Sequence, residues 1–247
     1  MKNPLLEGRQ ISKSFQGLAA VKQVNLTVFT GEMMGLIGPN GSGKTTLFDC
    51  LCCLQPVDRG KIFFKGRNVT QARPNQLARM GLARTFQRIR IYRQMTVLEN
   101  MLISRQWRGE TLLDIFKSSH RQTKIRAKEL LEFLLLSHLD REYAGNLSGG
   151  QQRLLEIGMA LMPDPEIILL DEATSGINPT LINTIKERIL ILNQQQGKTF
   201  LIIEHNINFI SDLCSRVCVL HQGEKLAEGT PDEIKTNKAV IEAYFGR

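Results

Sequence analysis

Long apolar runs are absent from this chain of 247 residues. A membrane-spanning helix needs about 18 or more predominantly apolar residues, and no segment approaches that length. The N-terminal sequence MKNPLLEGRQ also lacks the apolar core of a secretory signal peptide. We therefore expect a cytosolic chain without a membrane-spanning helix.

Cysteine is scarce, and its number, five, is odd. Cys50, Cys52 and Cys53 crowd one predicted helix, and Cys214 and Cys218 lie four residues apart on another helix-to-strand segment. Neither group has the spacing of a zinc ribbon, and an odd count argues against a disulfide framework. We expect buried free thiols in a reducing compartment rather than a metal or redox centre.

Acidic residues are few in one region, residues 79–128, which holds three acids and twelve Lys or Arg. The chain as a whole has a net charge of +8, so the rest is close to neutral. Such a basic segment could face anionic lipid headgroups, acidic loops of a partner or nucleic acid. It could equally be the solvated surface of a helical lobe. The sequence leaves these alternatives open.

The most informative motif is GPNGSGKTT at residues 38–46, which has the G-x-x-x-x-G-K-[ST] spacing of a phosphate-binding loop. Its glycines let backbone N–H groups turn inward around a polyphosphate. Lys44 supplies positive charge to the β- and γ-phosphates, and Thr45 offers a hydroxyl to Mg²⁺. We predict a nucleoside triphosphate site formed by the whole loop: Gly38, Pro39, Asn40, Gly41, Ser42, Gly43, Lys44, Thr45 and Thr46.

The segments on either side of this loop have the sequence patterns of a strand and a helix, as a phosphate-binding loop requires. MMGLI before it predicts a buried strand, and KTTLFDCLCCL after it predicts a helix whose N-terminus points at the phosphates.

A second motif follows the apolar run EIILLD, which predicts a strand of a parallel sheet covered on both faces. Asp171 closes this strand, where a ligand of Mg²⁺ is needed, and Glu172 is placed to orient or deprotonate an attacking water. An apolar run followed by two acids is weak alone, but it becomes strong downstream of a phosphate loop.

A third motif, LSGGQ, directly precedes the helical pattern QQRLLEIGMALM. Ser148, Gly149, Gly150 and Gln151 would form a helix N-terminus with unpaired N–H groups and a hydroxyl, which is a second anion site. One nucleotide needs one phosphate cradle, so a second cradle in the same chain requires an explanation.

Apolar periodicity predicts the remaining organisation. Residues 24–29 alternate as a strand, and from about Arg73 to Ser148 the pattern turns helical and basic. Within it, residues 124–139 predict a helix with one buried face, made of Ile125, Leu130, Leu131, Leu134 and Leu135. A further helix begins at Asn178-Pro179 and ends at Gly197, with a buried stripe of Leu181, Ile185, Ile189 and Leu192.

The three motifs, in this order and over essentially the whole chain, resemble the ATP-binding subunit of ABC transporters. In that family two subunits pack head to tail, and each ATP lies between the phosphate loop of one and the LSGGQ of the other. The resemblance therefore explains two anion sites in one chain.

The resemblance implies an α/β fold. Its P-loop NTPase core has a mostly parallel sheet and an antiparallel β subdomain, and a helical subdomain is inserted in it. Within one domain of residues 1–247, it implies a core of residues 1–86 and 165–247. The helical subdomain, which carries LSGGQ, would span residues 87–164.

The resemblance also assigns further residues. Gln87 matches the glutamine that reaches Mg²⁺ and the attacking water, and His205 matches the switch histidine at the γ-phosphate. Phe15 lies where the family places an aromatic ring against adenine, although a core phenylalanine is an alternative. Asn178 lies in the interface loop where many relatives have Asp. Ala173 replaces the proline that commonly follows the Asp-Glu pair, which would loosen this turn slightly.

A narrower likeness concerns the loop near Gln106 to Lys124, the segment FQRIRIYRQMTVLENMLI and the ending GTPDEIKTNKAVIEAYFGR. These segments look like the branched-chain or neutral amino-acid uptake ATPases. Urea-uptake and lipopolysaccharide-export ATPases share much of the pattern, and the export type tends to lack the loop.

The function implied is Mg²⁺-dependent ATP hydrolysis that energises uptake of branched-chain or neutral amino acids. The implied partners are integral membrane permease subunits and a second ATP-binding subunit, identical or related. A periplasmic or extracellular solute-binding protein would take part indirectly. The chain would be peripheral, at the cytoplasmic face of the cell membrane, with no nucleic acid bound.

Two other readings belong to different classes. One is a soluble ATPase acting on nucleic acid or ribosomes, motivated by the basic segment. Such proteins usually have two nucleotide domains or a long coiled coil in one chain, and neither is present. The other is a non-hydrolysing regulatory nucleotide binder, which the set Lys44, Asp171, Glu172 and His205 disfavours.

Overall fold

The computed structural model describes residues 3–105 and 119–245. Most of the loop predicted near Gln106 to Lys124, with Arg108 and Lys117 of the basic segment, lies outside the described residues. Among the described residues, no helix is both long enough and apolar enough to cross a membrane.

The main sheet has six strands in the order β10-β9-β3-β8-β7-β6. They are β3 (Met33–Ile37), β6 (Leu82–Arg84), β7 (Ile167–Asp171), β8 (Thr199–Ile203), β9 (Arg216–His221) and β10 (Glu224–Gly229). All neighbouring pairs are parallel except β10 with β9. The carboxyl ends of β3, β7 and β8 therefore meet at one edge, where ligands of parallel sheets are bound.

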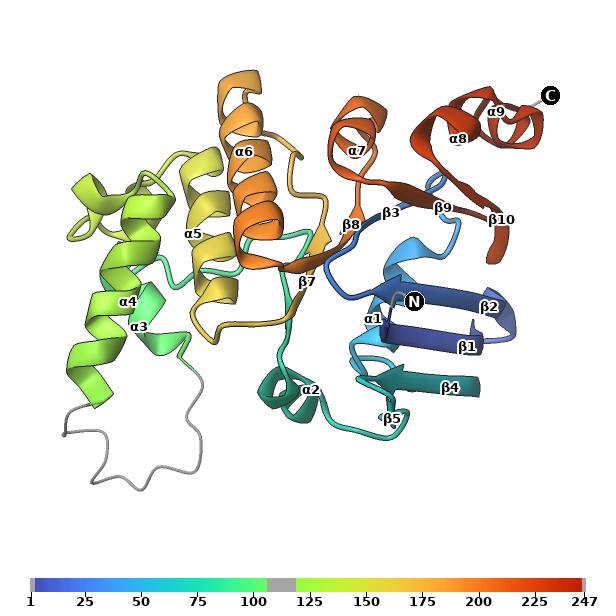
Figure 1. Ribbon diagram of the computed structural model, residues 1–247, viewed down its shortest axis with the longest axis horizontal. Helices are drawn as coiled ribbons and strands as arrows, with labels where there is room; N and C mark the ends of the chain where they lie inside the picture. Colours follow the sequence, from blue (N-terminus) through green and yellow to red (C-terminus); the bar gives the residue numbers. More distant parts are fainter. Residues whose placement is uncertain (1–2, 106–118, 246–247) are drawn as a thin grey trace.

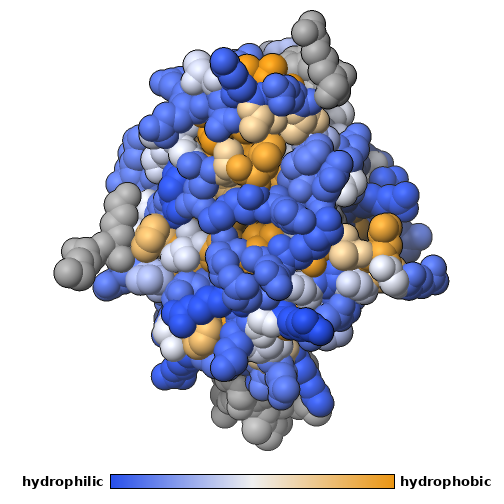
Figure 2. All heavy atoms as spheres, turned by 90° about the vertical axis from the view of Figure 1, so that its right-hand side faces the viewer, coloured by the Kyte–Doolittle hydropathy of each residue, from blue (hydrophilic) through white to orange (hydrophobic). Residues whose placement is uncertain are grey.

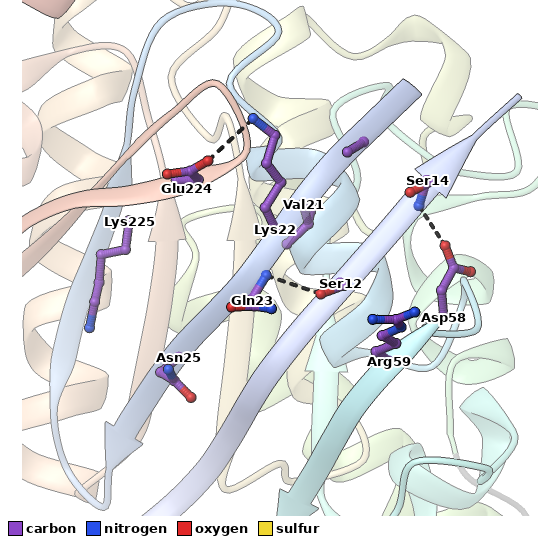
Figure 3. A pocket seen from close by; sticks show the side chains of 11 residues that line it. Ser12, Ser14, Val21, Lys22, Gln23, Asn25, Asp58, Arg59, Glu224 and Lys225 are labelled. Atoms are coloured by element: carbon purple, nitrogen blue, oxygen red, sulfur yellow. Dashed lines mark hydrogen bonds and ion pairs between the residues drawn. The ribbon is translucent and has the colours of Figure 1, made fainter. Parts of the chain in front are cut away.

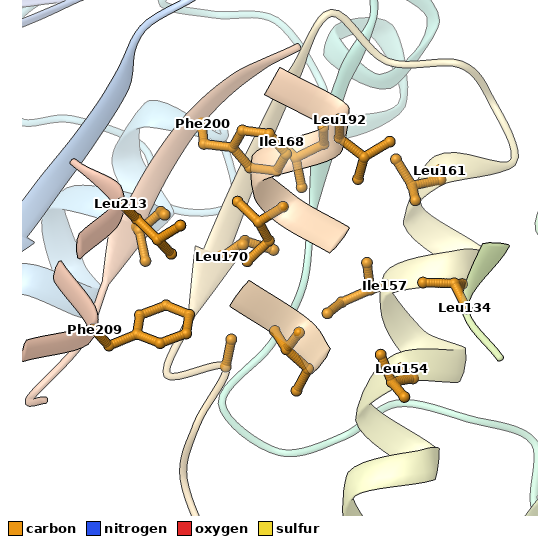
Figure 4. Packing of buried hydrophobic residues seen from close by; sticks show 14 of the residues in the cluster. Leu134, Leu154, Ile157, Leu161, Ile168, Leu170, Leu192, Phe200, Phe209 and Leu213 are labelled. Atoms are coloured by element: carbon orange, nitrogen blue, oxygen red, sulfur yellow. The ribbon is translucent and has the colours of Figure 1, made fainter. Parts of the chain in front are cut away.

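Strands of the sheet are covered on both faces, as their continuous apolar sequences require. In β7, Ile168 and Leu170 face one core cluster, whereas Ile167 and Leu169 face the other. The first cluster lies among the α-helices, and Figure 4 shows it between the sheet, with Ile168 and Leu170, and the segments that carry Leu192, Ile157 and Leu134.

The second cluster joins the main sheet to an antiparallel sheet through α1 (Lys44–Leu51). The antiparallel sheet has the order β2-β1-β4-β5, with β1 (Pro4–Phe15), β2 (Leu18–Phe29), β4 (Arg59–Phe64) and β5 (Arg67–Asn68). Leu47, Phe48 and Leu51 of α1 are fully buried in this cluster. The nucleotide-binding helix predicted from KTTLFDCLCCL is thus present, but it ends at Leu51.

The α-helices α3 (Val97–Ile103), α4 (Ser119–Phe133) and α5 (Gly149–Leu161) stand together at the end farthest from the antiparallel sheet, and α6 (Pro179–Gln196) lies beside α5 (Figure 1). This group also has the short turns η2 (Ser137–Leu139) and η3 (Ala144–Asn146). The other helices are α2 (Pro74–Met80), α7 (Ile207–Leu213), α8 (Pro231–Thr236) and α9 (Lys238–Phe245). The helices α3 to α9 contribute to the first cluster, on the other face of the main sheet, whereas Leu77 of α2 belongs to the second cluster (Figure 1).

Three details of the helical region differ from the prediction. Residues 82–84 form the edge strand β6 instead of helix, because they pair with β7 of the main sheet. Ile125 and Leu135 are 47% and 53% exposed, so they do not belong to the buried face of α4. The buried apolar residues here are Ala127 and Leu131 of α4, followed by Leu134 and Leu136 beyond its end at Phe133, where Leu135 has a positive φ of 59°.

The cysteines agree with the prediction for all but one thiol. Cys50, Cys52, Cys214 and Cys218 are buried and unpaired, whereas Cys53 is half-buried. Burial raises the pKa of Cys52 to about 12, so this thiol stays protonated and unreactive at neutral pH.

Candidate functional site

The phosphate loop connects β3 to the start of α1 and its geometry requires glycine. Gly43 has a φ of 100°, which L side chains rarely adopt, and a Cβ there would overlap the backbone carbonyl oxygen of Ala20. At Gly38 a Cβ would overlap the carbonyl oxygen of Leu220. The loop is thus pressed against β2 and β9, which leaves its other side for a ligand.

Lys44 is the buried cation of this loop. Its Nζ donates to the carbonyl oxygens of Gly38 at 2.8 Å and Pro39 at 2.9 Å. Burial lowers the pKa of Lys44, while the charges of Glu172 and Asp171 oppose that shift. Asp171 and Glu172 therefore lie close enough to Lys44 for their charges to act on it.

The turn between β9 and β10 supports the loop from outside, which the sequence motifs do not indicate. The N–H of Gly223 donates to the carbonyl oxygen of Ser42 at 3.1 Å, and the N–H of Lys22 donates to that of Gly223 at 2.7 Å. The only sequence signal would have been a Gln-Gly turn between two apolar runs.

Asp171 lies at the end of β7, at the carboxyl edge of the sheet. Its Oδ2 accepts a hydrogen bond from Arg84 at 3.0 Å, and Arg84 also pairs with Asp49 of α1. Burial raises the pKa of Asp171, and Arg84 opposes the shift. Its Oδ1 is buried with no hydrogen-bond partner, so one carboxylate oxygen is left for a ligand.

The residues predicted to hold Mg²⁺ are close together. Thr45, Gln87 and Asp171 line one pocket of about 360 Å³. A hydroxyl, an amide carbonyl and a carboxylate are the oxygen ligands that Mg²⁺ prefers. The donor set and the unpaired Oδ1 of Asp171 therefore fit this ion. Arg84, which also lines the pocket, pairs with Asp49 and with the other oxygen of Asp171.

Glu172, Gln87 and His205 form a connected set of side chains. Glu172 Oε1 lies 2.9 Å from His205 Nε2, and its Oε2 accepts from Gln87 Nε2 at 3.0 Å. Glu172 has a positive φ of 50°, uncommon outside glycine and frequent at functional sites. Gln87 and His205, which are far from Glu172 in the sequence, thus both contact its carboxylate.

A buried carboxylate, which the motifs do not indicate, connects the loops that carry Glu172 and His205. Glu204 is 3% exposed, and it accepts hydrogen bonds from the backbone N–H of Thr174 at 2.7 Å and from the Thr174 hydroxyl at 2.8 Å. It also accepts from the backbone N–H of His205 at 3.2 Å. This network holds the turn at Ala173, where the common proline is missing.

The LSGGQ segment begins α5. Ser148 Oγ accepts from the N–H of Gln151 at 3.3 Å, and Gln151 Oε1 accepts from the N–H of Ser148 at 2.9 Å, which is a capping box. Gly150 packs on Leu181 of α6, whereas a Cβ on Gly149 would meet nothing within 4 Å. In the described part of the chain, no hydrogen bond joins residues 148–151 to the phosphate loop, so the structure does not bring the two anion sites together.

Phe15 lies at the end of β1 and is 45% exposed, which is inconsistent with the alternative of a core phenylalanine. Lys13 Nζ lies 5.4 Å from the centroid of its ring. A hollow of about 850 Å³ lies elsewhere on the described part of the chain. It lies on polar side chains of β1, β2 and β10, including Lys22, Asn25 and Glu224 (Figure 3), which are not the predicted nucleotide residues.

Comparison with known proteins decides the family. A family model described as "ABC transporter" matches residues 21–175, which is more than half of the chain. The chain belongs to this ABC transporter family. It is an ATP-binding cassette with the family's ATP-hydrolysing activity, and the resemblance stated from the three motifs is confirmed.

Relatives and solved structures of ABC cassettes cover the chain almost completely. The High-affinity branched-chain amino acid transport ATP-binding protein LivG of Escherichia coli (strain K12) is 39% identical, over 100% of this chain and 99% of its own. BraF of Pseudomonas aeruginosa, with the same description, is 37% identical, over 100% and 99%. A second model, "Branched-chain amino acid ATP-binding cassette transporter", matches residues 224–247.

Among solved structures, a nucleotide-free ATP-binding cassette from an ABC transporter is 36% identical, with a TM-score of 0.88, and covers 99% of this chain and 100% of its own. A cassette in its ADP conformation is 35% identical, with a TM-score of 0.87 and the same coverage. The predicted α/β fold is confirmed.

Proposed function

We propose that this cassette energises an importer of branched-chain or neutral amino acids, with Glu172 as the general base of ATP hydrolysis. The observation that carries the catalytic part is the placement of Glu172 between Gln87 and His205, beside the phosphate loop. A carboxylate held by two side chains has a fixed direction, which general-base catalysis requires. Ala173 does not disturb this direction, because Glu204 holds the turn.

The other residues are assigned by chemistry. The loop of residues 38–46 binds the phosphates of ATP, Lys44 neutralises their charge, and the exposed ring of Phe15 stacks on adenine. Thr45, Gln87 and Asp171 would hold Mg²⁺, which would supply positive charge against the charge of the phosphates. His205 would contact the γ-phosphate.

A single chain forms an incomplete site under this proposal. Ser148–Gln151 would contact the nucleotide of a second cassette, whose phosphate loop they face in a head-to-tail dimer. A bacterial ABC transporter cassette solved as a dimer supports this pairing; it is 27% identical, with a TM-score of 0.80, and covers 92% of this chain and 99% of its own.

The substrate class and partners come from the relatives. LivG and BraF are described as branched-chain amino acid transport proteins, and the match at residues 224–247 is to a model of the same description. We infer association with membrane permease subunits at the cytoplasmic face, and an indirect role for an external solute-binding protein.

The test of the base is Glu172→Gln, which keeps the size and removes the proton acceptor. We expect kcat to fall by about 10²-fold or more, with ATP affinity retained and an ATP-bound dimer trapped. Glu166→Gln is a matched control, because Glu166 is exposed and pairs with Lys65, away from the site. Hydrolysis by Glu172→Gln at a rate near that of the unchanged protein would refute the assignment.

A further inference from the structure

A buried ion pair lies on α5, within two turns of the LSGGQ segment. Arg153 Nη1 is 2.5 Å from Glu156 Oε2, and the two side chains are only 1% and 5% exposed. Neither residue belongs to a motif that the sequence analysis identified. A cation and a carboxylate this deeply buried need a reason beyond helix packing.

Arg153 connects α5 to both catalytic segments. Its guanidinium donates to the carbonyl oxygens of Phe86 at 2.7 Å and Gln87 at 3.1 Å. It also donates to the carbonyl oxygen of Glu172 at 3.2 Å. One side chain therefore fixes the backbone of two residues whose side chains meet each other.

Glu156 holds the same loop through its N–H groups. Its Oε1 accepts from the backbone N–H of Phe86 at 3.3 Å and of Arg90 at 3.2 Å. The loop around Gln87 is thus tied to α5 on both sides of the glutamine.

Stability alone does not account for this arrangement. Replacing a buried ion pair by well-packed apolar residues is often neutral or stabilising. An arginine, however, presents five N–H donors in a rigid plane and can hold several carbonyl oxygens in one geometry, which an apolar side chain or a lysine cannot do.

We propose that Arg153 and Glu156 are positioning residues, which keep the side chains of Gln87 and Glu172 aligned with the LSGGQ helix. They act through the backbone of residues 86–90 and 172 and touch no reacting group. The inference rests on the proposed role of Glu172.

The experiment compares Arg153→Met, Arg153→Lys and Glu156→Gln in the full chain, with kcat, ATP affinity and the thermal midpoint measured for each. We expect kcat to fall by about tenfold or more in Arg153→Met, because a misplacement of about 1 Å can cost 10²-fold. ATP affinity should stay within about threefold, because the phosphate loop makes no contact with this pair. Arg153→Lys should recover only part of the loss.

Arg188→Met controls for a loss of stability without a change in the site. Arg188 lies on α6 with its side chain 18% exposed, and its guanidinium carbon is 5.3 Å from the centroid of the Phe133 ring. The substitution Arg188→Met should lower the thermal midpoint and leave kcat unchanged. In Glu156→Gln, the backbone amide hydrogens of Phe86 and Arg90 should exchange faster with solvent than in the unchanged protein. A general loss of stability would instead speed exchange at many other amides as well.

The inference is wrong if Arg153→Met and Glu156→Gln keep the kcat of the unchanged protein, or if kcat falls only in proportion to ATP binding. Because Arg153→Met could fail to fold, Glu156→Gln, which has the same shape as Glu156, decides the outcome in that case. The result is separate from the proposed function, since Glu172→Gln would remain inactive even if both α5 variants were fully active.

Discussion

Glycines of the phosphate loop differ in whether they can be replaced by a residue with a side chain. Gly41 and Gly43 both have positive φ, 78° and 100°, but only Gly43 is in close contact with other backbone. We predict that Gly43→Ala weakens ATP binding by more than about tenfold, because strain of about 1–2 kcal/mol adds to the overlap with Ala20. Gly41→Ala, whose Cβ meets nothing within 4 Å, should bind ATP within about tenfold of the unchanged protein.

Isothermal titration with ATP measures both variants, and circular dichroism checks that they are folded. Equal losses in the two variants would mean that the approach of the loop to Ala20 is not what requires glycine at residue 43.

Sequence motifs reveal residues that act through their own type and spacing. Lys44, Asp171 and Glu172 are of this kind, because their chemistry is readable from neighbours in the chain. Arg84, Arg153, Glu204 and Gly223 are not, because their roles come from residues distant in sequence. Arg84 meets Asp171 across 87 positions, and it is one of the basic residues of segment 79–128. Part of that basic segment is therefore internal structure rather than a free surface.

The ends of a helix could be predicted from sequence where capping residues next to them in the chain determine them. Asn178 caps α6 by accepting from the N–H of Leu181 at 2.9 Å, Pro179 begins it and Gly197, with a φ of 66°, ends it, as predicted. Ile125 shows the limit of such rules. A periodic apolar pattern names candidates for a buried face, but the orientation of α4 is set by its packing on α3 and α5.

One exposed carboxylate connects three elements of the molecule. Asp164, in the loop between α5 and β7, pairs with Lys198 before β8 at 2.8 Å and with Arg126 of α4 at 3.2 Å. The hydrogen bond from Lys198, with help from Arg126, lowers the pKa of Asp164 below its usual value of 3.8. In the unfolded chain this carboxyl has the higher pKa, so the ion pairs favour folding above that value.

We therefore predict that Asp164→Asn lowers Tm, by at most about 2–4 °C because Asp164 is largely exposed and screened. The difference from the unchanged protein should be full above about pH 5 and should shrink as the pH falls toward 3, since Asp164 becomes protonated in both states. Thermal unfolding from pH 3 to 7 measures it. A difference that is constant across this range would show that the charge of Asp164 contributes nothing.

At the scale of the whole molecule, the two predicted anion sites lie in different parts of the fold. The phosphate loop is near the antiparallel sheet, whereas α5 stands among the helices beyond α6 (Figure 1). The face that carries β2, β10 and α9 is mostly hydrophilic, with apolar side chains gathered in a few places (Figure 2).

Complementation between two inactive variants tests whether each site is shared. Lys44→Met removes the cation of the phosphate loop, and Gly149→Asp places a carboxylate where phosphate would bind, at a position with open space for a side chain. Each variant alone should be inactive. In a head-to-tail heterodimer, one site combines both defects, and the other has an intact Lys44 from one chain and an intact Gly149 from its partner.

An equal mixture should therefore regain about a quarter of the ATPase activity of the unchanged protein, since half of the dimers are mixed and each has one intact site of two. For the same reason, the specific rate of the unchanged protein should rise with its concentration until dimers predominate. Phosphate release measures both effects. A mixture as inactive as its components, together with a specific rate independent of concentration, would mean that one chain supplies its whole site, and α5 would then need another role.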